Sequence, residues 1–434
     1  MSKSSLKSSI LARMILVFLL TLVLLVPMVM VRSLISERQG RRQSAILEVT
    51  DKWANAQAII GPILTVPLKR NVPLPNGRDS VAVESLHILP DTLQVSGDLR
   101  TDARRRGIYE VVLYNTELRA TGKFDLGGVA PEAWNGATPL WKDAYLTMGI
   151  SDLRGIKDSV RMNWDDAELQ AEAGVRSTDV VRSGINLRVP LDPAVKSHTF
   201  DLALNLNGSS DLTFAPVGRR THVSMRSTWS SPSFTGAFLP DKRTVNKDGF
   251  SAEWTILELN RTFPQSWVDA QFHADQSNFG MSLLMPVDHY QKTTRSAKYA
   301  IMVIALTFLA LFLSEVLVKE ILHPVHYTLV GLALVLFYVL LLSMSEHFGF
   351  DFSYLVSSLG VLLPVTLYAH AILSQKRVAM LLGGLLLVVY SFFYVLLRLE
   401  DYALLIGSLA LLIVLAAVMY LTRKVNWYSI GEGS

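Results

Sequence analysis

Ionisable side chains in or beside apolar segments are the residues of this sequence best suited to chemistry. Charges at membrane depth are costly, so they are functional candidates. Glu315 lies inside an apolar run at residues 299–318, and three histidines are expected near the same membrane face: His323, His326 and His370. We interpret Glu315 as a residue that extends to the interface or pairs with Lys319 on the same helical face. The alternative is that this carboxylate and the imidazoles form a metal site or a proton relay.

A second group, Glu346, His347 and Asp351, is expected at the opposite membrane face. We interpret these side chains as a polar cap on a loop, and the alternative is a divalent-ion site. The sequence contains no Gly-x-Gly-x-x-Gly, Walker A, His-Glu-x-x-His or Gly-x-Ser-x-Gly pattern. It has no cysteine, which excludes thiolate catalysis, disulfides and Cys-ligated metals. We predict no catalytic residue, no cofactor and no bound metal; the alternative is a membrane-embedded hydrolase or metalloenzyme.

The composition is that of a membrane protein. Of 434 residues, 50% are hydrophobic and only 18% are charged, whereas a soluble globular chain averages about 25% charged residues. The net charge of +4 is typical of membrane proteins with basic cytoplasmic loops. Lysine and arginine form no stripe with interleaved aromatic residues, so no nucleic-acid partner is predicted.

Six apolar segments of membrane-spanning length position the candidate residues. The first, residues 14–32, follows a cytoplasmic N-terminus at residues 1–13. It resembles an uncleaved anchor, because its apolar run is long for a signal peptide and no Ala-x-Ala-like cleavage site follows. The other five form a predicted helical bundle at 297–421, followed by a cytoplasmic tail at 422–434. Their bounds are 299–318, 327–345, 353–373, 379–397 and 402–421.

Residues 33–60 are predicted to form a juxtamembrane helix. Five apolar residues recur at intervals of three and four: Ile46, Val49, Trp53, Ala56 and Ile60. They share one helical face, which packs on its own domain or, alternatively, makes a self-associating stalk. Gly61-Pro62 is expected to end the helix, because proline cannot continue it and restricts the residue before it.

Residues 61–296 are predicted to form a large β-rich, sandwich-like domain. Apolar residues alternate with polar ones over many short segments, which is the period of a strand. The clearest case puts four residues on one face: Phe200, Leu202, Leu204 and Leu206. Strands outnumber helices and no βαβ alternation occurs, so an antiparallel fold inserted between the first and second membrane segments is expected.

The charges of the short loops predict the orientation of the chain. Basic residues are carried by the loops 319–326 and 374–378 and by the C-terminal tail: Lys319, Lys376, Arg377, Arg423 and Lys424. The other two loops are acidic, with Glu346 and Asp351 in one and Glu400 and Asp401 in the other, the latter beside a single exception, Arg398. The positive-inside rule then puts both termini in the cytoplasm and the β-rich domain outside. Four arginines disagree, but long domains translocate largely regardless of charge: Arg32, Arg38, Arg41 and Arg42.

Several stretches together resemble the CreD family of Gram-negative inner-membrane proteins. They are 61–67 (GPILTVP), 106–109 (RGIY), 153–155 (LRG), 205–212 (NLNGSSDL), 231–236 (SPSFTG), 238–240 (FLP), 286–290 (PVDHY) and the run 297–350. The resemblance implies an inner-membrane protein whose expression belongs to the Cre two-component response. It also implies a role in envelope integrity, including tolerance of some envelope-directed toxins and β-lactam-related stress. It supplies no catalytic residue.

The sequence therefore predicts a non-enzymatic protein of the envelope stress response. The lipid bilayer is one partner, and a periplasmic envelope component or a protein is expected to bind the β-rich domain. The alternative function is a transporter or lipid-handling protein that uses the helix bundle, with Glu315 in the path. The sequence does not define the oligomeric state.

Overall fold

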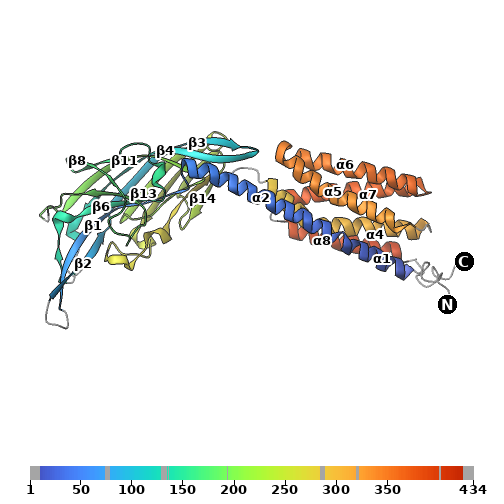
Figure 1. Cartoon of the computed structure of the whole chain (residues 1–434), viewed down its shortest axis with the longest axis horizontal. Coiled ribbons are helices and arrows are strands. Elements are labelled where there is room, and N and C mark those ends of the chain that lie inside the picture. Colours follow the sequence, from blue (N-terminus) through green and yellow to red (C-terminus); the bar gives the residue numbers. More distant parts are fainter. Residues whose placement is uncertain are drawn as a thin grey trace. The chain divides into compact units, whose positions relative to one another are not determined.

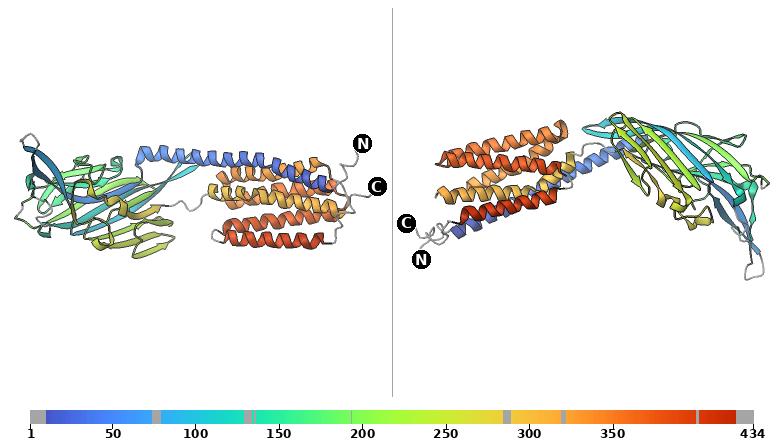
Figure 2. Two further views of the ribbon diagram at one scale, coloured as in Figure 1. Left: turned by 90° about the horizontal axis from the view of Figure 1, so that it is seen from below. Right: turned by 180° about the vertical axis from the view of Figure 1, so that it is seen from behind.

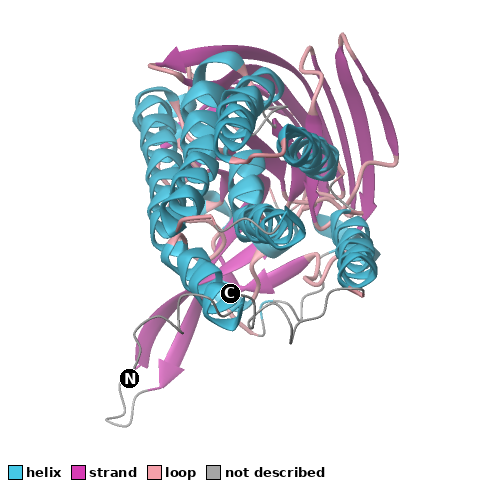
Figure 3. Ribbon diagram, turned by 90° about the vertical axis from the view of Figure 1, so that its right-hand side faces the viewer, coloured by secondary structure: helices cyan, strands magenta, loops and turns pink. Residues whose placement is uncertain are grey.

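The computed structural model describes residues 10–73, 79–128, 134, 136–192, 194–283, 289–318, 322–399 and 402–423. The chain divides into two units. The helical unit comprises Met1–Arg42 and Val287–Ser434, and the β-rich unit comprises Gln43–Pro286. Figure 1 shows the elements of each unit, and Figure 3 shows the strands as broad curved sheets.

The helical unit is built from long apolar helices that lie side by side in both views of Figure 2. Their bounds are α1 Ile10–Val23, α2 Leu25–Trp53, α3 His289–Lys298, α4 Ala300–Val318, α5 Pro324–Phe348, α6 Phe350–Ile372, α7 Lys376–Arg398 and α8 Ala403–Thr422. Only Leu24 separates α1 from α2, and α2 continues into the β-rich unit. Gly349 has a φ of +78° and separates α5 from α6, a conformation that glycine adopts without a steric penalty.

The described helices match part of the predicted set of six membrane segments. Four helical stretches are long and apolar enough to cross a membrane: Ala12–Trp53, Pro324–Phe348, Phe350–Ile372 and Lys376–Arg398. A bent pair, Tyr290–Lys298 with Ala300–Val316, makes a fifth if its 42° bend lies within one span. In the described residues α8 contains a shorter apolar helix, Leu405–Tyr420. The polar helix α3 overlaps the end of the range 61–296 that was predicted for the β-rich domain, because its sequence contains no apolar run.

The juxtamembrane helix ends earlier than predicted. α2 stops at Trp53, and β1 (Gln57–Pro73) begins soon after it. Gly61-Pro62 therefore lies inside a strand, where the register with β6 shifts between Ile60 and Ile63. Proline lacks an N–H and is tolerated at such an irregularity. The buried side chains of β1 account for the difference, because pairing with β6 and β2 outweighs the local helical pattern.

The β-rich unit contains two sheets in the described residues. The ten-stranded sheet has the order β14-β18-β12-β1-β6-β10-β9, with β2 and β5 on β1 and β17 on β2. The eight-stranded sheet has the order β15-β16-β13-β3-β4-β11-β7-β8. Strand bounds beyond β1 are β2 Asp79–Ile88, β3 Thr92–Arg106, β4 Tyr109–Asp125, β5 Thr138–Pro139, β6 Tyr145–Ile150, β7 Arg161–Trp164, β8 Ala167–Gln170, β9 Glu172–Ala173, β10 Gly184–Arg188, β11 Ser197–Ser209, β12 Asp211–Phe214, β13 Arg220–Ser227, β14 Pro232–Gly236, β15 Lys242–Asn246, β16 Gly249–Leu257, β17 Ser266–Val268 and β18 Phe279–Leu283.

The predicted alternation is confirmed in β11, where all four predicted residues are buried: Phe200, Leu202, Leu204 and Leu206. One hydrophobic cluster joins residues of both sheets, including Leu64 of β1 and Leu202 of β11. Burying each such side chain contributes about 1.5–3 kcal/mol. This shared core fixes the exposed faces on which a binding site can form.

Candidate functional site

Glu315 lies in α4 with its carboxylate buried in the helical unit. Arg13 of α1 donates from Nη1 to Oε1 at 3.1 Å, and the Tyr327 hydroxyl of α5 donates to Oε2 at 2.8 Å. Lys319, its predicted partner, lies outside the described residues. Each carboxylate oxygen therefore has a donor, which a buried charge requires. Glu315 therefore links α4 to α1 through an ion pair and to α5 through a hydrogen bond.

Glu346, near the end of α5, has the same kinds of partner. The Tyr290 hydroxyl of α3 donates to Oε1 at 2.8 Å, and Arg38 Nη1 of α2 lies 3.9 Å from Oε2. Close by in sequence, Arg32 donates from Nη2 to the carbonyl oxygen of Ala297 at 3.2 Å. Each of the first two helices is thus held by an Arg–Glu–Tyr group. In α1, Arg13 pairs with Glu315, which also binds Tyr327. In α2, Arg38 pairs with Glu346, which also binds Tyr290.

The spacing of these two groups along the helices is close to the thickness of a bilayer. Arg13 and Arg38 are 25 positions apart in the sequence, which is about 38 Å of α-helix at 1.5 Å per residue. The hydrocarbon core of a bilayer is about 30 Å thick, and the bilayer with its headgroups about 40–45 Å. The two Arg–Glu pairs therefore fit the two interfaces of one membrane.

The histidines predicted to accompany Glu315 have separate partners. His323 accepts the Val325 N–H through Nδ1 and caps the start of α5, a structural role. His326 Nδ1 lies 2.7 Å from the Tyr368 hydroxyl. His370 is half-buried on α6. Across the described residues no group of three His, Asp or Glu side chains could hold a metal ion, so the predicted metal-site alternative is not assembled there.

The predicted group at Glu346 is also divided. His347 is exposed and contacts the ring of Phe348. Asp351 pairs with Arg398 at 2.9 Å, although Arg398 was the exception to the charge pattern of the loops. Of these three residues, only Glu346 belongs to the buried group with Tyr290 and Arg38. The divalent-ion alternative therefore does not hold for them.

A polar junction in the β-rich unit was not singled out from the sequence. Arg154 donates to both Asp152 oxygens, from Nε at 2.9 Å and Nη2 at 2.7 Å, and the Asn55 N–H donates to Oδ2 at 2.9 Å. The Arg154 guanidinium and these N–H groups lower the pKa of Asp152 from 3.8 to about 2. Buried Gln57 donates to the carbonyl oxygens of Asp152 and Asn207. This network fixes the start of β1 immediately after α2.

Two glycines make this junction possible. A Cβ on Gly155 would overlap the Asn207 carbonyl oxygen, and one on Gly208 would overlap the Tyr114 hydroxyl, which donates to the Asp211 carbonyl. Both glycines lie in stretches that carry the family resemblance, 153–155 and 205–212. The family resemblance of these two stretches was the sequence signal for the junction. Only the structure shows that the two stretches lie together.

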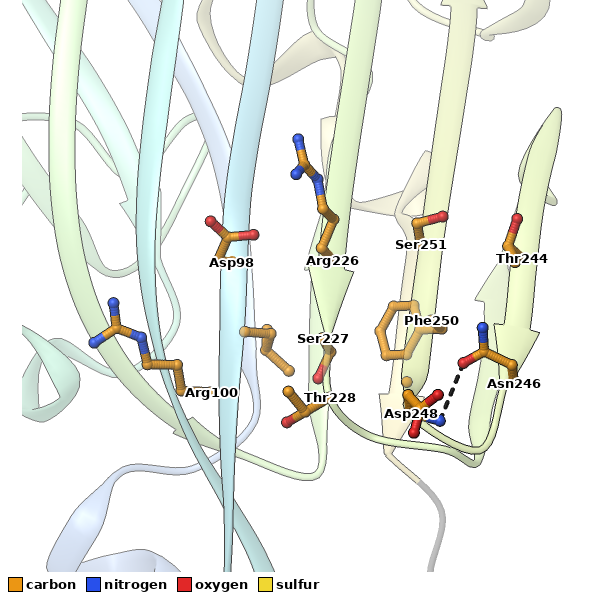
Figure 4. Close-up of a pocket in the computed structure, with 12 residues that line it drawn as sticks. Asp98, Arg100, Arg226, Ser227, Thr228, Thr244, Asn246, Asp248, Phe250 and Ser251 are labelled. Atoms are coloured by element: carbon orange, nitrogen blue, oxygen red, sulfur yellow. Dashed lines mark hydrogen bonds between the residues drawn. The ribbon is translucent and has the colours of Figure 1, made fainter.

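An open pocket of about 580 Å³ lies on the eight-stranded sheet, where β13 ends (Figure 4). Asp98 of β3, Arg226 of β13 and Ser251 of β16 are neighbours in the strand register, and their side chains line it together with Arg100. Figure 4 shows both arginines and both acidic residues, Asp98 and Asp248, around this space. Mixed charge and hydroxyl groups favour a polar ligand.

Several apolar helices with a large β-rich unit inserted after the first define a multi-pass membrane protein. A family model described as "Inner membrane protein CreD" matches residues 9–428. The chain is 31% identical over 432 residues to "Inner membrane protein CreD" of Escherichia coli (strain K12), covering 98% of this chain and 95% of that protein. The chain belongs to the CreD family, and the predicted family and its inner-membrane location are confirmed.

Proposed function

We propose that this chain maintains the integrity of the cell envelope from the inner membrane, without catalysis. Six spans anchor it: the α1–α2 helix, the bent α3–α4 pair, α5, α6, α7 and α8. The β-rich unit, a two-sheet sandwich, lies in the periplasm and binds an envelope component or a protein partner. The open pocket of the eight-stranded sheet, whose lining includes charged and hydroxyl side chains, is the observation that carries this proposal.

Charges at the helix ends support this orientation. Lys376 and Arg377 begin α7 and Arg423 follows α8, whereas Asp351 begins α6. The positive-inside rule assigns the basic ends to the cytoplasm. The Asp351 carboxylate pairs with Arg398, so the one basic exception at the outer face is neutralised. Both termini are then cytoplasmic.

A deletion strain tests this function. Loss of the gene is expected to lower survival under β-lactam and detergent stress, and the unaltered chain is expected to restore it. Arg226→Glu reverses a charge in the pocket and is expected not to restore survival. Arg243→Glu, on exposed β15 outside the pocket lining, is the matched control and is expected to restore it. Equal survival of the deletion and parent strains would contradict the proposal.

A lipid-handling function is the second candidate, because α4, α7 and α8 line a partly open apolar pocket of about 280 Å³. Its lining includes Met302, Leu385, Phe393 and Gly407, and no polar atom is exposed there. An acyl chain fits such a surface. Gly407 has open space where a Cβ would lie, so Gly407→Phe would fill this pocket. Unchanged lipid co-purification and envelope survival in this variant would count against lipid handling.

A further inference from the structure

Strand β3 is longer than its neighbour β13 and leaves part of one edge open. The two strands pair in parallel from Thr92 with Arg220 to Leu99 with Ser227. Beyond Leu99, β3 pairs with β4 alone, as far as Arg106 with Tyr109. Figure 4 shows β3 continuing past the end of β13 at Ser227. Residues 100–106, here called the β3 edge, therefore have no strand on their β13 side within the described chain.

The register identifies the backbone groups that face this open side. Arg220 N–H donates to the Asp91 carbonyl at 3.1 Å, so odd-numbered residues of β3 face β13. The two-residue turn Gly107-Ile108 requires Arg106 and Tyr109 to be a hydrogen-bonded pair. Hydrogen-bonded pairs alternate along an antiparallel ladder, so the backbone N–H and C=O groups of even-numbered β3 residues are directed to β4. Both arguments leave the N–H and C=O groups of Thr101, Ala103 and Arg105 directed outward. Such a row of groups is a template for another strand.

The β3 edge has only one of the devices that usually protect an edge strand, its charged side chains. Charged residues (lysine above all), proline, bulges and short length discourage pairing with other chains. The outer strand of the same sheet, β15, is short and begins with Lys242, and β14, at the end of the other sheet, begins with Pro232. By contrast, residues 100–106 contain neither proline nor lysine, and their register with β4 is unbroken. Residues 102–106 are all exposed.

The charge of this segment indicates the kind of partner. The hairpin arm, residues 100–115, contains four arginines, and each pairs with a carboxylate of this chain: Arg100 with Glu117, Arg104 with Asp102, Arg105 with Glu110 and Arg106 with Glu48. These pairs lie in solvent-accessible positions, at 3.6, 3.0, 2.6 and 2.7 Å, and Arg104 also lies 4.7 Å from the centre of the Trp53 ring. Exposed pairs contribute only about 0–1 kcal/mol. Carboxylates of a partner can therefore compete for these arginines.

We propose that the β3 edge binds an extended acidic peptide segment of a protein partner, which adds a strand along the line that β13 vacates. The proposal rests on the partner binding proposed above and names its mode. Backbone hydrogen bonds to Thr101, Ala103 and Arg105 supply affinity, and the adjoining pocket with Arg226 receives a side chain of the peptide. A lipid surface would not use these backbone groups, because it presents no strand.

The full chain in detergent provides the direct test, with three fluorescent peptides. The first alternates Glu and Val, the second alternates Lys and Val, and the third is the Glu/Val peptide with N-methylated peptide bonds. Only the first is expected to bind, and it should slow amide hydrogen exchange in residues 100–106. Equal binding of the methylated acidic peptide would mean attraction by charge alone and would overturn the proposal. Failure of all three peptides to bind would also overturn it.

Two variants at one position separate strand addition from general damage. Ala103→Pro removes an outward N–H without removing a hydrogen bond to β4, and we expect at least a tenfold weaker affinity for the acidic peptide. Ala103→Ser keeps the N–H and is expected to bind within about twofold of the unaltered chain. Equal affinity of both variants would contradict strand addition.

A complementation assay distinguishes this proposal from the broader function. If deletion of the gene impairs envelope survival and Ala103→Pro fails to restore it while Ala103→Ser succeeds, strand addition is supported. If Ala103→Pro restores survival fully, strand addition is wrong and the envelope function stands. If deletion itself has no effect on survival, the envelope function is wrong.

Discussion

The two Arg–Glu–Tyr groups of the helical unit use the same chemistry in different surroundings. The Glu315 side chain is 4% exposed and pairs with Arg13 at 3.1 Å, whereas the Glu346 side chain is 8% exposed and pairs at 3.9 Å with Arg38, itself 39% exposed. A buried ion pair is costly to break, because removing one partner leaves the other charge buried away from solvent. The comparison therefore predicts that the Glu315 group contributes more to the free energy of unfolding than the Glu346 group.

Arg13→Ala is expected to give the largest effect. It leaves the Glu315 carboxylate buried with one donor, which costs about 3–5 kcal/mol of unfolding free energy. Chemical unfolding of the detergent-solubilised chain measures this loss. The double variant Arg13→Leu with Glu315→Leu removes both charges and should recover most of it. A loss below about 1 kcal/mol for Arg13→Ala would remove the distinction between the two groups.

Tyr327→Phe removes the other donor of Glu315 and is expected to cost about 1.5–3 kcal/mol, the range for a hydrogen bond to a charged group. The same unfolding measurement applies. Tyr290→Phe is the matched change at Glu346, where the carboxylate is nearer to solvent, and should cost less. A larger loss for Tyr290→Phe would reverse the comparison.

Asp152 extends the comparison to an arginine–carboxylate pair in the β-rich unit. Its pKa is about 2 in the folded chain against 3.8 ordinarily, so its contribution is complete above about pH 5 and is lost as the pH falls towards 2. The shift corresponds to about 2 kcal/mol of unfolding free energy. Tryptophan fluorescence during unfolding at several pH values measures it. Asp152→Asn should be less stable near neutral pH and should lose less stability over this range, and identical profiles would contradict the role.

Arg38→Ala is expected to give the smallest effect, about 0–1 kcal/mol, because this arginine is partly exposed and its pairing distance is long. Glu346 retains the Tyr290 hydroxyl in this variant. Arg41→Ala, which breaks an exposed pair with Glu37, is the matched control, and both variants should unfold at nearly the same denaturant concentration. A loss comparable to that of Arg13→Ala would show that the Arg38–Glu346 pair stabilises the chain as much as the Arg13–Glu315 pair.

Features encoded by local pattern could be predicted from the sequence, and features set by distant contacts could not. Apolar runs predicted α5, α6 and α7, and alternation predicted the buried face of β11. Arg13 is separated from Glu315 by 302 positions, so no local spacing could pair them. The alternative of a histidine group around Glu315 is not assembled, because sequence proximity does not direct side chains towards one another: His323 and His326 have other partners. The early end of α2 followed from strand pairing of β1, which local helical periodicity does not report.

Cysteine accessibility tests the proposed orientation most directly, because the natural chain has no cysteine. One variant carries Arg243→Cys on exposed β15, and another carries Arg423→Cys after α8. A membrane-impermeant maleimide applied to intact spheroplasts should label the first variant, and it should label the second only after lysis. Labelling of position 423 before lysis, with position 243 protected, would contradict a periplasmic β-rich unit and cytoplasmic termini.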